Sequence, residues 1–376
     1  MSIGGEGGME WNGEAIKALA KERKVTLADL ANQIGVSRQS LTDWINGALP
    51  KGIHLIALCK KLGVTPNTFF KVSDDNGITV PVHRAKANAK VTPERQGYAH
   101  ELAREYSLFF KNISDPRIVP VIRSKDRSDE SARNIADKLR VRADARKGEP
   151  LNPEEAFTLM ENLGIHVIIK EFPNTIKAYA FYTNIHSYRV VFLDYNTKIS
   201  DLIFALLHES IHAIRDEGGI GTSYDPDEEK FCDLVANYIQ FPEEYIKFVF
   251  DSIHGLPNKG HQINQLKTFG QKNIHALYGL VQQIIKSHPT FNLNVGGADT
   301  NFRKVFPSIG DELFSDSDVS SYLNTLRRIS PVFFHEIVKQ YSGLSDRRLG
   351  ELLGVEHILD GKEVRLELEK SYKQRA

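Results

Sequence analysis

The stretch FALLHESIHAI at residues 204–214 most constrains how this chain can fold, because it places two histidines inside an apolar run. It contains the pattern H-E-x-x-H at His208, Glu209 and His212. If the stretch is helical, the two imidazoles lie on one face, since residues four apart are neighbours on a helix. Two imidazoles at this spacing can bind one zinc ion, and Glu209 beside it can accept a proton from a water molecule. The fold must therefore bury this helix and bring a third ligand to it.

A second helix, predicted at residues 227–239, can supply the third protein ligand that a catalytic zinc site requires. Glu229 and Asp233 are four residues apart and share a face of this helix. We assign Glu229 as the third ligand and Asp233 as the carboxylate that orients a ligating histidine. Glu228 is the alternative ligand. A solvated acidic first turn, favoured by the helix dipole, is the alternative explanation for this cluster.

Three β-strands are predicted ahead of the H-E-x-x-H helix, at residues 165–170, 178–182 and 189–193. We expect them to form a small antiparallel sheet. This order is similar to that of the zincin metallopeptidases, in which the edge strand binds an extended substrate by strand addition. A donor should also stabilise the oxyanion that develops during such a reaction. Its candidates, which the sequence does not rank, are Tyr224, His166, Tyr182 and His186.

Residues 10–72 show a succession of short helices separated by turns. Thr26 and Ser37 are suitable N-caps for two successive helices, and Gly35 ends the first of them. Two helices joined by such a short turn form a helix-turn-helix. The stretch TLADLANQIGVSRQSLTDWING at residues 26–47 closely resembles the phage-repressor (Xre-type) family.

This resemblance implies that the third helix enters the major groove of a double-stranded DNA operator. The residues that would face base edges are Arg38, Gln39, Thr42 and Asp43, and those that would approach phosphates are Ser37, Ser40 and Asn46. Arginine and glutamine suit guanine and adenine edges. Asp43 departs from this pattern, because an acid repels phosphate and can only accept a hydrogen bond from a base such as cytosine. A bundle that contacts protein is the alternative.

Residues 130–250 resemble the ImmA/IrrE family of zinc-dependent peptidases. The matching segments are LGI at 163–165 with Val167, VVF at 190–192, FALLHESIH at 204–212, and the helix from Glu229 to Pro242. The chain keeps this proline but has Ile-Gln-Phe before it, where family members usually have Leu-Leu-Met. The resemblance implies site-specific cleavage of a repressor-type DNA-binding protein. Many members carry an Xre-type domain in the same chain.

The distribution of charge is more informative than its total. The 48 Lys and Arg residues balance the 48 Asp and Glu residues of this 376-residue chain. Residues 11–71, however, carry nine basic against four acidic residues, and residues 82–147 carry sixteen against nine. A cationic first part suits a polyanion, although a solvated basic surface without a ligand is also consistent with it.

The cysteine content and hydropathy indicate a cytoplasmic protein. The two cysteines, Cys59 and Cys232, both lie in apolar helical patterns and need no disulfide. The Gly-rich N-terminal residues lack the apolar segment of a signal peptide. No apolar run approaches the length of about 18 residues that a membrane span needs, so no membrane contact is expected.

We therefore expect a predominantly helical α+β chain in four parts. These are a five-helix bundle with the helix-turn-helix at 1–75, a helical connecting region at 76–129, a zincin-like metallopeptidase domain with a three-stranded sheet at 130–250, and a mostly helical region of unknown role at 251–376, which includes one helix at 264–287. A homodimer is compatible with this organisation.

The favoured hypothesis is a zinc-dependent endopeptidase, with one zinc ion per chain, fused to a sequence-specific DNA-binding domain. It would cleave itself or a partner repressor, with Glu209 as the general base. One alternative is a non-enzymatic transcription regulator whose metal domain senses zinc or a ligand. Another is an antitoxin-like protein whose metallopeptidase fold only binds a partner. Glu209 favours the enzyme, because a sensor has no need of a base beside its metal.

Overall fold

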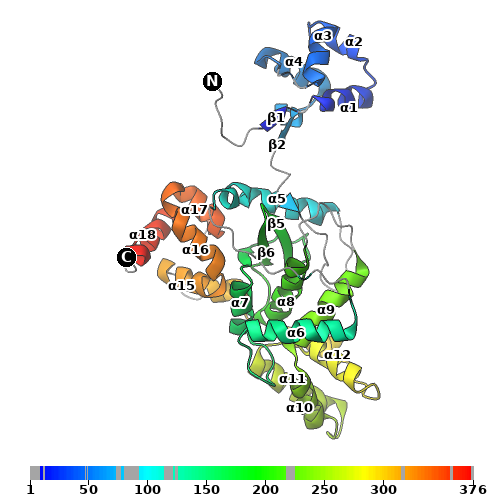
Figure 1. Cartoon of the computed structure of the whole chain (residues 1–376), viewed down its shortest axis with the longest axis vertical. Helices are drawn as coiled ribbons and strands as arrows, with labels where there is room; N and C mark the ends of the chain where they lie inside the picture. The colour runs from blue at the N-terminus through cyan, green and yellow to red at the C-terminus, as the bar shows by residue number, and fades with distance from the viewer. Residues whose placement is uncertain are drawn as a thin grey trace. The chain divides into compact units, whose positions relative to one another are not determined.

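The chain folds into two compact units, which the computed structural model places at Met1–Gly77 and Ile78–Ala376. Helices predominate in both units (Figure 1). The structure describes residues 9–11, 13–46, 48, 50–72, 78–79, 93–113, 122, 126–216, 225–314, 318–355 and 359–373. No helix among these residues is both long enough and apolar enough to cross a membrane.

The N-terminal unit is a small helical bundle around one apolar core. Its helices are α1 (Glu14–Glu22), α2 (Leu27–Gln33), α3 (Arg38–Ile45), α4 (Gly52–Leu62) and the 3-10 helix η1 (Pro66–Phe69). Ile16, Leu30, Leu41, Leu58 and Phe69, one from each element, are each at most 1% exposed. The expected bundle is thus present with four α-helices, and its fifth helix is a 3-10 turn.

A two-stranded ribbon, which the sequence analysis did not anticipate, closes this bundle. Strand β1 (Met9–Trp11) pairs antiparallel with β2 (Phe70–Val72). The Trp11 indole N–H donates a hydrogen bond of 2.6 Å to the carbonyl of Trp44. Gly13 permits this close approach, because a Cβ there would lie 2.1 Å from the same carbonyl oxygen. The ribbon is therefore anchored directly to the end of α3.

The larger unit contains a four-stranded sheet in the order β3-β5-β6-β4. The strands are β3 (Ile78–Thr79), β4 (His166–Lys170), β5 (Ala180–Ile185) and β6 (Tyr188–Asp194). The three strands that the sequence predicted are all present, and β3 extends them beside β5. The antiparallel expectation is correct for β5 with β6 but wrong for β4, which pairs with β6 in parallel.

The turn between β5 and β6 explains why the prediction failed only for β4. His186 and Ser187 both have positive φ angles, 50° and 71°, which form a tight hairpin of the kind that joins antiparallel strands. After β4, by contrast, the longer connection 171–179 carries the chain across to the far side of β6. Parallel pairing requires such a crossover, and a local sequence pattern does not reveal it.

The H-E-x-x-H helix is α8 (Ile199–Arg215), and it packs against β5 and β6. Helix α9 (Pro226–Gln240) lies along α8, and α6 (Asp129–Arg142) lies along α9 (Figure 1). Helix α7 (Pro153–Asn162) packs against α8, and α5 (Pro93–Lys111) packs against β5. The site-bearing helices are therefore central to the largest core.

Residues 241–306 form a second apolar core beside the first. It contains α10 (Glu243–Ile253), α11 (Lys259–Asn273), α12 (Leu277–Ser287) and α13 (Gly296–Arg303). The single helix predicted at 264–287 is wrong, because the chain breaks at Ile274 with a φ of 53°. The buried His275 follows, and its ring lies 2.9 Å from the Tyr245 hydroxyl. Burial of a polar ring thus interrupts a continuous apolar pattern.

The remaining helices return to the first core rather than forming a region of their own. They are α14 (Ile309–Leu313), α15 (Val319–Ile329), α16 (Pro331–Gln340), α17 (Asp346–Leu353) and α18 (Gly361–Lys373). The Tyr106 hydroxyl on α5 donates to the carbonyl of Leu352, and the Tyr106 ring contacts Phe192 and Phe333. Aromatic packing thus joins the sheet to these C-terminal helices.

Candidate metal centre and nucleic-acid interface

Helix α8 is buried along almost its whole length. Thirteen of its 17 residues are buried, as expected of a helix surrounded by protein. His208 is 5% exposed and His212 is 4% exposed. Burial of two imidazoles is unfavourable unless their nitrogens are hydrogen-bonded or bind a metal. The contacts of these two rings therefore decide the chemistry of the site.

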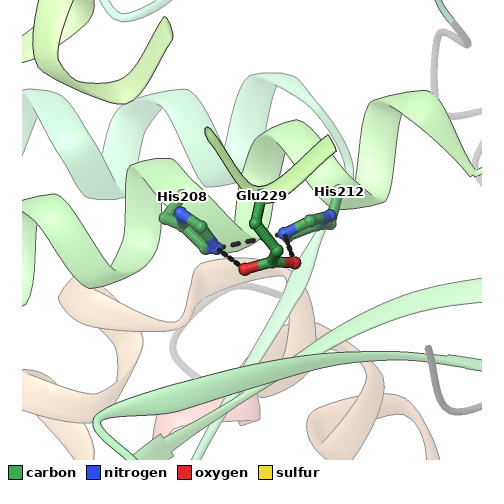
Figure 2. A group of neighbouring side chains, drawn as sticks. All are labelled: His208, His212 and Glu229. Carbon is green, nitrogen blue, oxygen red and sulfur yellow. Dashed lines mark hydrogen bonds and ion pairs between the residues drawn. The ribbon is translucent and has the colours of Figure 1, made fainter. Parts of the chain in front are cut away.

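The structure brings His208, His212 and Glu229 together, the first two from α8 and the third from α9 (Figure 2). The two Nε2 atoms lie 3.0 Å apart. The Glu229 carboxylate lies 3.5 Å from Nε2 of His208 and 3.2 Å from Nε2 of His212. One nitrogen or oxygen atom from each residue thus converges on a single buried point. These are the three residues that the spacing of the sequence assigned as ligands.

Asp233 lies where a carboxylate can orient His208. Its Oδ1 is 3.0 Å from Nδ1 of His208, on the side of the ring away from Glu229. This contact favours the tautomer with a proton on Nδ1, which leaves the Nε2 lone pair for a metal. Burial lowers the pKa of His208, but Asp233, Glu229 and Glu209 outweigh it and raise the pKa to about 10. The surrounding carboxylates thus favour a positive charge at this point.

His212 has a different neighbour, which the sequence analysis missed. The Cys232 Sγ atom lies 3.6 Å from Nδ1 of His212 and 3.9 Å from a Glu228 oxygen. Burial raises the pKa of this thiol well above its ordinary value, and Glu228 and Glu229 raise it further. A neutral thiol can accept from Nδ1–H and donate to Glu228. The i, i+4 spacing on α9 indicates the contact of Cys232 with Glu228, but no local pattern indicates its contact with His212.

Glu228, the alternative ligand, is bound to two arginines instead. It forms an ion pair with Arg215, and its Oε2 lies 2.9 Å from Nε of Arg127. Burial raises the pKa of Glu228, but the two arginines outweigh this effect and lower it. The structure therefore separates the roles of the two neighbouring glutamates. Glu229 faces the histidines, whereas Glu228 pairs with cations.

Glu209 lies beside the three converging side chains, with its carboxylate held by the sheet. It is 4% exposed, and its Oε2 accepts a hydrogen bond of 2.8 Å from the backbone N–H of Tyr182 on β5. Glu209 and His208 both border a cavity of about 640 Å³. The carboxylate is thus fixed in orientation and open to a ligand in that cavity.

Three of the four candidate oxyanion donors are engaged elsewhere. The Tyr182 hydroxyl donates to Asp216, and Nε2 of His186 lies 2.7 Å from the Ser107 hydroxyl. The His166 ring packs against Phe110 and Tyr188. The fourth candidate, Tyr224, lies outside the described residues. The hydrogen bonds of Tyr182 and His186 therefore go to residues other than the three candidate ligands.

The donor set fits a zinc ion. Two imidazole nitrogens and a carboxylate are ligands that Zn²⁺ favours, and catalytic sites commonly combine three protein ligands with one open position. The three donor atoms lie within 4.8 Å of one another, and all three residues are buried. The second nitrogens of both rings also have neighbours that can orient them, as ligating histidines usually do. His208, His212 and Glu229 are therefore suited to hold one such ion.

The predicted DNA-contact residues lie on the outer face of α3. They are Ser37, Arg38, Gln39, Ser40, Thr42, Asp43 and Asn46. Ser40 is partly buried, and the other six are exposed. The opposite face of α3 is anchored in the core by Leu41, Trp44 and Ile45. Among the described residues, the side chains of the face that would enter a groove are thus exposed apart from Ser40.

Local hydrogen bonds arrange this face. The Ser37 hydroxyl caps α3 by accepting from the backbone N–H of Ser40 at 3.0 Å. The Gln39 amide donates to the Asp43 carboxylate at 2.8 Å. This contact gives a role to the acid that departs from the recognition pattern.

Comparisons with known proteins agree with this interface. The helix-turn-helix family model HTH_3 matches residues 16–69, the span from α1 to η1. A search of curated proteins finds no match. The crystal structure of ComR from Streptococcus suis aligns with this chain at 9% sequence identity. The alignment covers 96% of this chain and 94% of the ComR chain. Its TM-score of 0.15 is too low to support an inference. The sequence match and the geometry of α2 and α3 together show that the chain carries the helix-turn-helix domain of a DNA-binding regulator.

Proposed function

We propose that this DNA-binding regulator is also a zinc-dependent endopeptidase that cleaves a repressor-type protein, either itself or a partner. The observation that carries the proposal is the convergence of His208, His212 and Glu229 at one buried point beside Glu209. A structural zinc site needs only ligands, whereas a hydrolytic site also needs a base. Glu209 borders the cavity next to the three ligands and is suited to be that base.

Each residue of the site would have a separate role in peptide hydrolysis. His208, His212 and Glu229 would hold the zinc ion, which when bound polarises the scissile carbonyl and acidifies water. Glu209 would accept a proton from the attacking water and deliver it to the leaving amine. The Tyr182 N–H would keep one Glu209 oxygen fixed, so that the carboxylate meets the water in a constant orientation. Asp233 and Cys232 would hold the two imidazoles in place.

Strand β5 is suited to bind the peptide. Its first residue, Ala180, and the preceding Tyr179 border the cavity. Among the described strands, β3 pairs only with Ile185 and Asn184 at the other end of β5. The Ala180 end of this edge is therefore not covered by another described strand, and an extended peptide can add to it there. Such a peptide would run directly past Glu209.

The identity of the substrate class rests on two further observations. The segments between residues 163 and 242 resemble the ImmA/IrrE peptidases, whose substrates are repressor-type proteins. The same chain carries a helix-turn-helix domain, itself of the repressor type. A peptidase linked to a DNA-binding domain is better suited to switch a regulated gene than to degrade proteins generally.

The test combines metal analysis with a search for cleavage. The full chain is purified without chelator, and its zinc content is measured. The zinc-loaded protein is then incubated alone, and in parallel with an added Xre-type repressor and with a proteome-derived peptide library. New N-termini are identified by mass spectrometry. Glu209→Gln is the inactive variant, and Glu336→Gln, which changes another buried glutamate on α16, is the matched control.

We expect one zinc per chain in all three proteins, and new N-termini with the wild type and Glu336→Gln only. The loss should exceed about 100-fold in Glu209→Gln, since a positioned general base contributes about 10²- to 10⁴-fold. A wild type that binds zinc but cuts neither itself, the repressor nor any peptide would refute the peptidase and favour a metal-dependent sensor.

A further inference from the structure

The cavity beside the candidate metal centre has walls from two distant parts of the sequence. Its volume is about 640 Å³. Helices α8 and α9 supply one side, including His208 and Glu209, whereas α12 and α13 supply the other. The second side belongs to the region for which the sequence suggested no role. A volume of this size matches the pockets that enclose small-molecule and peptide ligands.

The wall formed by α12 and α13 is fixed to α8 by polar contacts. The Asp299 carboxylate on α13 caps α12 by accepting from the backbone N–H groups of Leu277 and Tyr278, at 2.6 and 3.3 Å. The backbone N–H of Ala276 donates to the carbonyl of Ser200 at 3.2 Å. The cavity is therefore bounded by fixed elements on both sides.

The charged side chains of this wall lie close together, and with Glu209 and Asp233 they give the cavity more acidic than basic groups. Arg303 forms an ion pair with Asp299, and its guanidinium also lies 2.9 Å from Asp201 of α8. The Arg303 guanidinium also donates a hydrogen bond of 3.2 Å to the Tyr179 hydroxyl. Arg303, the one arginine among the described residues that line the cavity, is thus already shared by two carboxylates. This arrangement offers little attraction to an acidic ligand group.

The rest of the lining is mainly apolar. Phe204 and Ala205 contribute from α8, Phe241 follows α9, and Tyr278 and Gly279 contribute from α12. A Cβ on Gly279 would lie 3.4 Å from the Phe241 ring and 3.2 Å from Asn237, which also line the cavity. The absence of a side chain at Gly279 therefore keeps this part of the cavity open.

We propose that this cavity binds a bulky aliphatic or aromatic side chain of the cleaved peptide, next to the bond that is cut. The proposal rests on the proposed peptidase function and adds the substrate class to it. The apolar walls favour burial of such a side chain, whereas the acidic groups of the lining repel an acidic one and Arg303 is already paired. Residues 277–303 thereby have a role as the specificity wall of the site.

Hydroxamates of single N-acetylated amino acids provide the test, because the hydroxamate group binds zinc while the side chain enters the adjacent cavity. Binding of the glycine, leucine, phenylalanine, lysine and glutamate derivatives to the zinc-loaded full chain is measured by calorimetry. We expect the leucine and phenylalanine derivatives to bind about 10- to 100-fold more tightly than glycine, in keeping with the transfer free energy of these side chains. Glutamate should bind no more tightly than glycine, and lysine should bind less tightly than leucine.

Two variants test whether the preference for apolar side chains arises in this cavity. Gly279→Leu fills the cavity and should abolish the preference for phenylalanine over glycine. Tyr278→Ala removes an aromatic wall residue that is 51% exposed, so the protein should fold, and it should reduce the preference several-fold. The matched control is Phe248→Ala, which removes another exposed aromatic ring, 58% exposed, on α10 outside the cavity. It should retain the full preference.

The outcomes separate this proposal from the proposed function. Equal affinities across the series in the zinc-loaded wild type would overturn the specificity pocket alone. Selective binding of the apolar hydroxamates by a protein that cuts no peptide would support the pocket and overturn the peptidase. A purified chain that binds no zinc would overturn both.

Discussion

Helix α3 of the helix-turn-helix and helix α8, which carries two of the candidate zinc ligands, are built in opposite ways. On α3 the side chains that carry the function are exposed, and their hydrogen bonds join residues three or four positions apart, as between Ser37 and Ser40 or Gln39 and Asp43. On α8 the functional side chains are buried, and they meet Glu229 and Asp233 of a different helix. The side chains on α3 are arranged by hydrogen bonds within that helix. The cluster around α8, by contrast, forms only when the larger unit has folded.

This difference predicts how each site responds to substitutions. A substitution on the outer face of α3 removes one contact to DNA and leaves the bundle intact, because the core residues lie on the opposite face. A substitution in the metal centre leaves a buried polar group without its partner, and such a group is unfavourable in a low-dielectric interior. The two units should therefore respond independently to mutations. The following predictions test that independence, from the largest expected effect to the smallest.

Removal of a ligand from α8 should abolish zinc binding without affecting DNA binding. For His212→Ala we expect zinc affinity to fall by more than about 100-fold, because even the groups that orient ligands contribute about 10- to 100-fold. Metal analysis and a chelator competition measure this effect. His254→Ala, which removes an exposed histidine from the same unit, is the control and should bind zinc normally. A parallel loss of DNA affinity in His212→Ala would contradict the independence of the units.

Replacement of a predicted base-contacting side chain on α3 should weaken DNA binding without affecting zinc binding. Arg38→Ala should weaken operator binding by about 10- to 100-fold, which corresponds to a specific base contact of about 1–3 kcal/mol. Zinc content should not change. Gel-shift titrations at fixed salt measure the loss, and Lys60→Ala, an exposed basic residue on α4, controls for the change in charge. Equal losses in the two variants would show that α3 does not read base edges.

Cys232 should tune the metal centre more weakly than a ligand does. Because its sulfur lies 3.6 Å from Nδ1 of His212, Cys232→Ala should lower zinc affinity by about 10-fold. Cys232→Ser should lose less, since a hydroxyl can still accept from Nδ1–H. Cys59→Ala, at the other cysteine of the chain, is the matched control and should bind zinc like the wild type. Identical affinities in Cys232→Ala and the wild type would show that His212 needs no partner here.

The buried His275 should make the larger unit less stable in acid. Burial lowers the pKa of His275 to about 4, against a smaller opposing effect of the Ala276 carbonyl. In the unfolded chain this pKa returns to about 6.5, so the unfolded state binds more protons between pH 4 and 6.5. The free energy of unfolding should therefore fall as the pH falls through this range, by roughly 1–3 kcal/mol.

Denaturant unfolding at several pH values measures this effect, with His275→Gln for comparison. The variant should lose the part of the acid sensitivity that lies between pH 4 and 6.5. Since His275 belongs to the larger unit, the unfolding of the N-terminal bundle should be the same in both proteins. An unchanged pH dependence in His275→Gln would show that another group is responsible.

The sequence was most informative where structure depends on neighbours along the chain. The N-caps Thr26 and Ser37 accept the backbone hydrogen bonds expected of them, and Asn152 forms a capping box with Glu155. The helical spacing of H-E-x-x-H likewise places both imidazoles on one face of α8. Such signals act within about four residues, a range that a sequence pattern records directly.

The sequence was least informative where distant segments meet. It gave no indication that β4 pairs in parallel with β6, or that the predicted helix at 264–287 breaks at Ile274. It also left Glu228 as a possible ligand, although Arg127 lies 101 positions away in the chain and pairs with it. Cys232 was dismissed as an apolar core residue. Its role depends on a contact with a ring 20 positions away.

By itself, then, the sequence determined the helices that carry each site and the residue types on their faces. The local rules of capping and helical periodicity are sufficient for that. Only the tertiary structure decided which carboxylate faces the histidines, which residues orient them, and that α12 and α13 form a wall of the adjacent cavity. These features depend on the packing of elements far apart in the chain, where burial and pairing of charge select one arrangement among those that local patterns allow.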